Sequence, residues 1–223
     1  MDLFSTLLLA LVEVTAPTAA QVAAPAAVVA QVAPAFDPAS VPRLPSGLAS
    51  PMPGGYLAGY PVDTGLDLAG IKKPVFAIAS GWVEYAEEGH TAWNAPRDSK
   101  YAIRIRLDDP IRLADGRKVT HVWYAHLHAM AFEQPEDGGV LSGHPRKHRR
   151  VEKGEFLGIS GVANGSWHLH LGMLLDGQTS QRWGTYLLED EVRGVLAGVG
   201  AQPLRKGSRL ADFPPPVRGG RAR

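Results

Sequence analysis

Short apolar runs separated by glycine, proline and aspartate fill the chain from Ser50 onward. This texture is typical of antiparallel β-structure. One later segment has a helical period instead, because Leu188, Val192, Val195 and Leu196 lie at positions i, i+4, i+7 and i+8. The pattern therefore predicts a mainly β domain followed by one helix. The expected strands cover residues 75–79, 82–85, 101–107, 119–127, 156–160 and 168–174.

Residues 1–50 differ in composition from the rest, because Ala, Val, Pro and Gln dominate and no Lys or Arg precedes Arg43. Residues 3–12 have the length of a signal-peptide apolar core, and residues 24–26 would serve as a cleavage site. The basic start of such a signal is missing, since Asp2 stands there. The apolar run is too short to form a stable membrane span. We expect an exported protein of the cell envelope or periplasm.

These patterns divide the chain into three parts. Residues 1–50 are expected to form a leader or signal segment with an Ala/Pro-rich tether, which we take to be flexible to about residue 45. Residues 51–187 form the β-rich domain, and residues 188–223 form a docking helix and a disordered basic tail. The default expectation for the oligomeric state is a monomer.

Charge and cysteine content narrow the chemistry. The formal net charge of +1 argues against a nucleic-acid partner, because no broad basic surface is encoded. A local basic cluster at residues 146–150 is either a solvated loop or a rim that attracts an anionic polymer. The chain has no cysteine, so a metal site must use His, Asp and Glu.

The segment Trp167-His168-Leu169-His170-Leu171 is the centre of the candidate chemistry. Its alternation predicts a half-buried strand with both imidazoles on one face, about 6.6 Å apart. One imidazole could bind an ion while the other acts beside it. A surface strand that carries two histidines by chance remains the alternative for this segment taken alone.

Two further segments carry residues of the same kind. Asp63 and Asp67 would share a face if their segment is extended, and both could ligate a divalent cation. Tyr124, His126 and His128 would likewise share one face of a regular strand. Three such segments in a cysteine-free chain favour a mononuclear metal site. The residues expected on the opposite face of the second strand are Trp123, Ala125 and Leu127.

Several other side chains are given smaller roles. His121 has the opposite parity to the site histidine of its strand and should lie away from the metal. His128 is a candidate for the rim of a cleft, and Trp167 for the floor of a substrate groove. Trp82 and Trp123 are expected in the core.

In the order and spacing of its motifs, the chain resembles the lysostaphin-type or LytM-like zinc metallopeptidases, which cleave peptide cross-links of bacterial peptidoglycan. That family has H-x-G-x-D, P-V-x-A-x-x-x-G-x-V, Y-x-H-L, V-x-x-G-x-x-I-G-x-x-G and H-L-H. The match covers roughly residues 59–175, and its counterparts here are residues 63–67, 74–83, 124–127, 151–161 and 168–170. The resemblance implies an antiparallel two-layer β-sheet groove built on a duplicated hybrid motif.

The resemblance also implies roles for individual residues. Asp67 and His170 correspond to zinc ligands, and His126 and His168 to the pair that orients the nucleophilic water and steadies the oxyanion. The remaining ligand position departs from the family, because Asp63 stands where the family has histidine. A carboxylate can still bind zinc. Two carboxylates would weaken the ion as a Lewis acid and would admit harder metals such as manganese.

Asp63 leaves two functions open. The first is a metalloendopeptidase with an Asp/Asp/His zinc site, a peptidoglycan peptide as substrate and Asp63, Asp67 and His170 as ligands. The second is a non-catalytic relative that binds peptidoglycan or regulates a hydrolase. The matched histidines favour catalysis, whereas the replaced ligand favours the binding protein.

Overall fold

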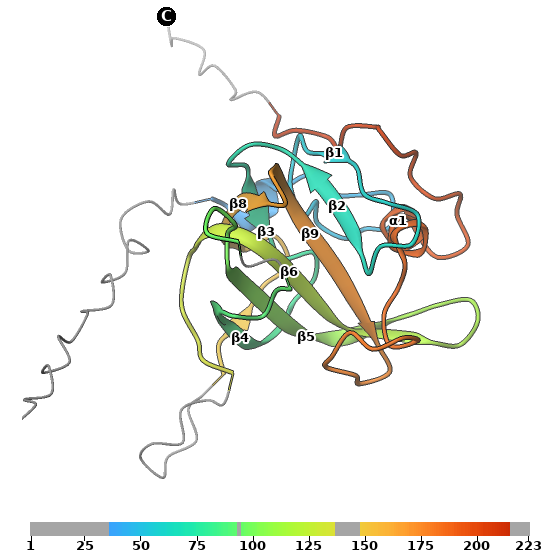
Figure 1. Cartoon of the computed structure of the whole chain (residues 1–223). Coiled ribbons are helices and arrows are strands. Elements are labelled where there is room, and N and C mark those ends of the chain that lie inside the picture. The colour runs from blue at the N-terminus through green and yellow to red at the C-terminus, as the bar shows by residue number, and fades with distance from the viewer. Residues whose placement is uncertain (1–35, 93–94, 137–147, 215–223) are drawn as a thin grey trace, which may run out of the picture.

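The computed structural model describes residues 36–92, 95–136 and 148–214. Within these ranges the fold is mainly antiparallel β with one α-helix, as the sequence predicts (Figure 1). The apolar run of residues 3–12, the cleavage site and residues 146–147 lie outside the described part. The elements are η2 (Pro38–Ser40), β1 (Tyr56–Leu57), β2 (Leu66–Ala69), β3 (Pro74–Phe76), β4 (Gly81–Glu88), β5 (Tyr101–Arg112), β6 (Lys118–Met130), β7 (Arg150–Val151), β8 (Phe156–Ala163), β9 (Ser166–Leu175) and α1 (Glu189–Ala197).

All of the described strands belong to one sheet with the order β1-β2-β9-β8-β6-β5-β4-β7, and β3 pairs with β8 beside this path. Strand β9 occupies a central place. It pairs with β2 along one edge, with β6 along the other, and with β8 through a tight turn at Asn164 and Gly165. Both turn residues have positive φ, 47° and 74°, as such a turn requires. The sequence predicts β3, β4, β5, β6, β8 and β9, whereas it gives no signal for the short strands β1, β2 and β7.

Alternation along the central strands separates two faces of the sheet. Leu169, Leu171 and Met173 of β9 join the main hydrophobic core, and Leu66 and Leu68 of β2 pack beside them. The residues between these positions point to the other face, where they line a cleft. The period of two in the sequence thus separates the core from the candidate site.

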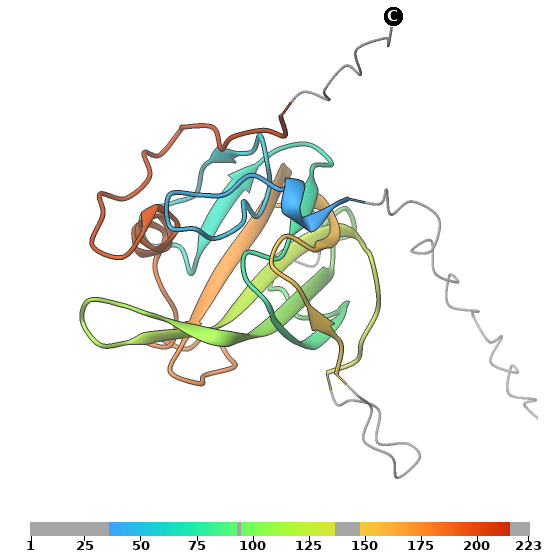
Figure 2. The same ribbon diagram turned by 180° about the vertical axis from the view of Figure 1, so that it is seen from behind.

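The core face is covered by segments from both ends of the described chain. Figure 2 shows residues 36–50 running across the back of the sheet. Val41, Leu44 and Ala49 of this segment are buried, and so is Leu210 near the other end. The expected flexible tether to residue 45 is therefore wrong from residue 36 onward. Apolar side chains that looked like linker composition bury themselves against the sheet.

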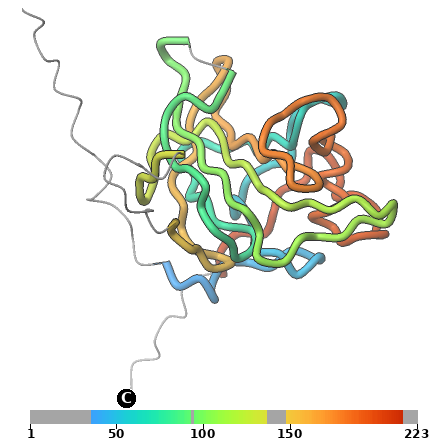
Figure 3. Tube along the Cα trace, turned by 90° about the horizontal axis from the view of Figure 1, so that it is seen from below, coloured from blue at the N-terminus to red at the C-terminus, as the bar shows by residue number. Residues whose placement is uncertain are grey.

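Helix α1 packs at the side of the sheet beside β2. Its predicted apolar stripe is confirmed, because Val192, Val195 and Leu196 are buried in the main core. The β5–β6 hairpin projects away from the rest of the sheet (Figure 3). Among the described residues, no helix has the length and apolarity needed to cross a membrane.

Candidate metal centre

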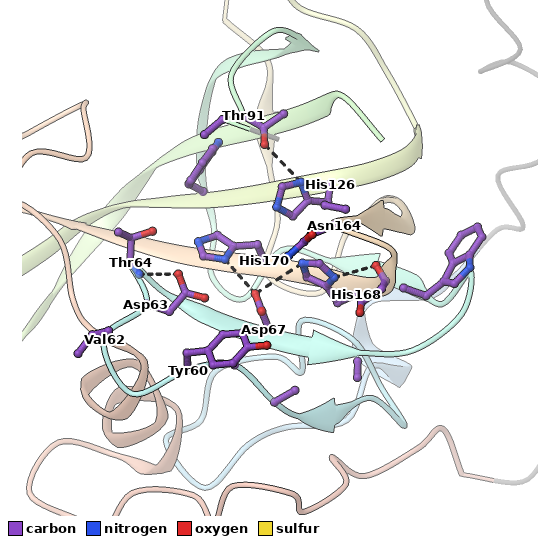
Figure 4. Close-up of a pocket in the computed structure, with 18 of the residues that line it drawn as sticks. Tyr60, Val62, Asp63, Thr64, Asp67, Thr91, His126, Asn164, His168 and His170 are labelled. Carbon is purple, nitrogen blue, oxygen red and sulfur yellow. Dashed lines mark hydrogen bonds and ion pairs between the residues drawn. The ribbon is translucent and has the colours of Figure 1, made fainter. Parts of the chain in front are cut away.

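Asp67 and His170 meet across the β2–β9 ladder. They are direct partners in the register, and Ala69 pairs in the same way with His168. His170 Nδ1 lies 3.0 Å from Asp67 Oδ1, and His168 Nε2 lies 3.7 Å from the same oxygen (Figure 4). An imidazole bonded to a carboxylate must carry its proton on the bonded nitrogen, so His170 Nδ1 donates to Asp67. The strand geometry expected for the H-L-H segment is confirmed.

Asp63 reaches the same point from a turn and not from a strand. Its backbone N–H donates to Tyr60 O at 3.0 Å, and its carboxylate accepts from Thr64 N at 2.7 Å. Ligand atoms of Asp63, Asp67 and His170 all lie within 4.8 Å of one another. The expectation that the two aspartates share the face of an extended segment is wrong, because β2 begins only at Leu66. The turn bends the chain so that both carboxylates still converge.

Gly65 allows the turn to approach β9 closely. A Cβ atom at this position would lie 2.6 Å from Leu171 O, 2.9 Å from His170 Nε2 and 3.0 Å from Gly172 Cα. Two of these three contacts are with backbone atoms of β9, which cannot simply rotate away. The glycine therefore brings Asp63 and Asp67 up to His170.

His126 enters the site through a bulge in β6. Its φ of 62° is left-handed, which is uncommon for a residue with a side chain. In the ladder with β5, Tyr124 pairs with Ile103 and Leu127 pairs with Tyr101, so β6 uses one residue more than its partner. An extra residue of this kind kinks a strand and re-aims a side chain. The bulge turns His126 toward His168 and His170, whose ring centroids lie 5.0 and 5.9 Å away.

The bulge also overturns the expected faces of β6. Tyr124 is fully buried in the core, where its hydroxyl accepts a hydrogen bond from Ile78 N at 2.9 Å. Trp123 lines the cleft, and its ring lies edge-on to His170 at 5.5 Å. Tyr124 and His126 therefore lie on opposite faces. Trp123, expected in the core, is partly buried against a small cluster of Tyr85, Ala102 and Ala125 and also lines the cleft. A period of two cannot reveal an inserted residue.

The protonation states suit a metal site. Burial works against the Asp67 carboxylate, but the hydrogen bond with His170 and the neighbouring imidazoles lower the pKa of Asp67 below its ordinary value. Burial, with nearby His170 and His168, lowers the pKa of His126 to about 3. At neutral pH the site thus holds an ionised carboxylate and a neutral imidazole beside it.

The three converging residues fit a divalent ion. Carboxylate oxygen and imidazole nitrogen are ordinary zinc ligands at about 2.0–2.2 Å, which places ligand atoms of a tetrahedral ion about 3.3–3.6 Å apart. His170 Nδ1 and Asp67 Oδ1 are already 3.0 Å apart. The 4.8 Å span of the whole set closes to this range by a shift of about 1 Å. Two oxygens and one nitrogen also suit harder cations.

A cleft with a volume of about 610 Å³ surrounds these residues. Sequence reasoning missed several of its polar side chains, among them Thr91 and Gln181. Thr91 Oγ1 lies 3.3 Å from His126 Nδ1, and Gln181 Nε2 donates to Thr64 O at 3.1 Å. Both belong to loops that connect regular elements, and no periodicity marks such residues in a sequence.

The residues given smaller roles differ in outcome. His121 is buried away from the cleft and contacts Glu84 at 3.3 Å, as expected. Trp167 lines the cleft, whereas His128 is exposed with its ring 6.1 Å from that of Trp167. Trp82 is exposed, so its expected place in the core is wrong.

The described part of the basic cluster is largely neutralised. Arg149 pairs with Glu155, and Arg150 pairs with Asp108 and Glu152. These ion pairs reduce the local positive charge, so the described residues favour the solvated loop over a rim for an anionic polymer.

A second group of potential ligands, Glu87, His90 and Glu136, lies outside the cleft. Its members are already engaged, because His90 contacts Glu87 at 2.8 Å and Arg104 donates to Glu136 at 2.6 Å. The guanidinium supplies the positive charge that a cation would bring, so this cluster is an ion-pair network.

The chain is similar to several solved protein structures. No protein-family model and no curated protein sequence matches the chain. A Pseudomonas aeruginosa structure assigned to peptidase M23 is 17% identical, with a TM-score of 0.42, over 72% of this chain and 55% of that one. Lysostaphin from Staphylococcus simulans is 21% identical, with a TM-score of 0.38, over 70% of this chain and 54% of that one.

A third similar structure is the catalytic domain, carrying one substitution, of the prophage-encoded M23 protein EnpA from Enterococcus faecalis. It is 15% identical, with a TM-score of 0.39, over 68% of this chain and 96% of that one. The chain spans about half the length of the first two structures. These three structures are M23 or lysostaphin proteins, the group whose motifs the sequence resembles.

Proposed function

We propose that this protein is a metal-dependent endopeptidase that hydrolyses peptide bonds of bacterial peptidoglycan in the cell envelope. One observation carries the proposal. Asp63, Asp67 and His170 converge within 4.8 Å on the floor of a cleft, and the imidazoles of His126 and His168 lie beside them. A protein that only binds a polymer has no need of this combination of three ligands and two further bases.

Asp63, Asp67 and His170 would hold the ion, with zinc as the first candidate. Such an ion supplies Lewis acidity to a scissile carbonyl and lowers the pKa of water to near neutrality. A ligating nitrogen cannot carry a proton, so binding through Nδ1 would require the His170 proton, now bonded to Asp67, to move to Nε2. Metal binding is expected to weaken as the pH falls, because protons then compete with the ion for the imidazole and the carboxylates.

His126 and His168 would handle protons and the oxyanion. His126 is neutral at pH 7, since its pKa lies near 3, and a neutral imidazole can donate from one nitrogen and accept at the other. Thr91 contacts His126 at Nδ1, which directs Nε2 away from that hydroxyl. His168 Nδ1 lies 3.0 Å from Ser166 O, so it donates there and leaves Nε2, on the Asp67 side, as the acceptor.

The cleft suits a slender polymer such as a peptide. Its lining combines small residues with polar ones, and its volume of about 610 Å³ lies within the range of ligand sites. The small residues among them are Ala58, Gly59, Ala69, Ala92 and Ala163. These small residues leave room between the bulkier Tyr60, Trp123 and Trp167 for an extended backbone to approach the carboxylates.

A second function rests on Asp63. Two carboxylates give the ion more negative charge than one carboxylate and two imidazoles do, so water bound there would be less acidic. A non-catalytic protein that binds peptidoglycan or regulates a hydrolase would tolerate this change. We therefore keep the peptidase as the proposed function, with a rate of peptide hydrolysis that Asp63 limits.

Purified protein tests both functions. Metal analysis should find about one divalent ion per chain, and His170→Ala should remove both the ion and hydrolysis of cell-wall sacculi. Asp63→His should raise hydrolysis. A metal-free preparation that binds sacculi, with no hydrolysis by the wild type or by Asp63→His, would exclude the peptidase and leave the binding protein.

A further inference from the structure

The loop between β9 and α1, residues 176–188, lies outside every motif of the resemblance, yet it reaches the cleft. It has a defined shape because Thr185 bonds within it. Its hydroxyl accepts from Arg182 N at 2.8 Å and lies 2.7 Å from Ser180 O, and its carbonyl accepts from Leu175 N at 2.9 Å. These bonds present Gln181 to the cleft.

Gln181 spans the gap between this loop and the turn that carries Asp63. Its Nε2 donates to Thr64 O at 3.1 Å, and the bond is partly buried. Gly172 of β9 leaves room for it, since a Cβ atom there would lie 3.1 Å from that nitrogen. The contact joins residues 117 positions apart in the chain.

The loop is fixed to a largely buried ion pair two residues before Gln181. Arg104 Nη1 donates to Thr179 O at 2.7 Å, and Arg104 Nε donates to Glu84 at 2.6 Å. Arg104 is only 8% exposed. A hydrogen bond from a charged, largely buried donor is stronger than one between neutral groups. The bond from Arg104 therefore holds the loop segment next to Gln181 in place.

The turn itself needs an external support. The bonds from Asp63 N to Tyr60 O and from Thr64 N to Asp63 are internal and set only its shape. Tyr60 and Val62 are 73% and 79% exposed, so their side chains do not pack the turn against the sheet. The orientation of Asp63 toward His170 therefore depends on the close packing of Gly65 on β9 and on what holds Thr64.

We propose that Gln181 is a positioning residue that holds Thr64 and thereby keeps the Asp63 carboxylate facing Asp67 and His170. The inference rests on the proposed function, because it matters for chemistry only if Asp63 is a metal ligand. Gln181 touches neither the carboxylates nor the imidazoles through any described hydrogen bond. It acts through the backbone, and a supporting partner of this kind is typically worth a factor of about 10 in metal affinity.

Gln181→Met tests this, because methionine keeps the length of the side chain and removes the amide donor. Gln178→Met is the matched control, since Gln178 is exposed in the same loop. In metal-free protein, amide hydrogen exchange of residues 62–65 should be faster in Gln181→Met than in the control. The affinity for Co²⁺, followed by its visible absorption, should fall about tenfold relative to the control.

The two readouts separate this inference from the proposed function. Exchange of residues 62–65 that is the same in both variants overturns the role of Gln181. Faster exchange with unchanged Co²⁺ affinity overturns it too, because Asp63 would then not need the support. A wild type that binds no Co²⁺ refutes the proposed function, and the exchange comparison still decides whether Gln181 holds the turn.

Discussion

Gly65→Ala should separate the carboxylates from His170 while leaving the chemical identity of every ligand intact. The added methyl carbon would lie 2.6 Å from Leu171 O, roughly 0.7 Å closer than the shortest ordinary carbon–oxygen contact of about 3.3 Å. Leu171 O is a backbone atom of the central strand β9, so the turn must move instead. The displacement carries Asp63 and Asp67 away from the imidazole.

A shift of about 0.7 Å exceeds the tolerance of about 0.2 Å in metal–ligand distances. We therefore expect zinc affinity to fall on the order of tenfold to a hundredfold, the size of effect seen when ligand support is lost. The unfolding free energy of the metal-free protein should fall by about 1–3 kcal/mol, as for overpacking elsewhere. Competition with a chromophoric chelator measures the affinity, and urea unfolding measures the stability.

Gly194→Ala is the control, because a Cβ atom there would meet only Pro203, at 3.9 Å, and the residue lies inside α1. That substitution should leave zinc affinity unchanged and stabilise the helix by up to about 1 kcal/mol. A Gly65→Ala protein that is folded and binds zinc as tightly as the wild type would refute the argument. The carboxylates would then not depend on close approach of the turn to β9.

Two further predictions concern buried polar groups. Burial opposes ionisation of Glu84, but hydrogen bonds from His121 and Arg104 lower its pKa to about 2, so its stabilising effect is full above pH 4.5 and is lost as the pH falls toward 2. Glu84→Gln should thus cost about 2 kcal/mol at pH 7 and little at pH 2, measured by urea unfolding; a pH-independent difference would contradict this. Tyr124→Phe leaves Ile78 N without its acceptor and should cost about 1–3 kcal/mol in the same assay, whereas no loss would show that another group replaces the hydroxyl.

Much of the fold follows from local patterns. The helix α1 and the strands β3, β4, β5, β6, β8 and β9 appear where the helical period and the alternation place them. The position of His168 and His170 on one face also follows from the pattern. Leu169 and Leu171 are buried in the core, and alternation along the strand places the histidines on the opposite face. At these positions the local sequence pattern and the tertiary packing favour the same structure.

The site itself depends on features without a local signal. The bulge at His126 arises where β6 leaves β9 and begins to pair with β8, so it is set by the register of distant strands. It reverses the expected faces of Tyr124 and Trp123. An inserted residue changes no side chain in the sequence, and only strand pairing reveals it.

The two aspartates show the same division between sequence and structure. Their residue types and their spacing already indicate ligands, since carboxylates four positions apart beside an H-L-H segment suit a metal. Their convergence was decided by the turn before β2, by the close approach at Gly65 and by the bond from Gln181. Periodicity fixes which way a side chain points within one strand, whereas the distance between ligands depends on contacts between segments far apart in the chain.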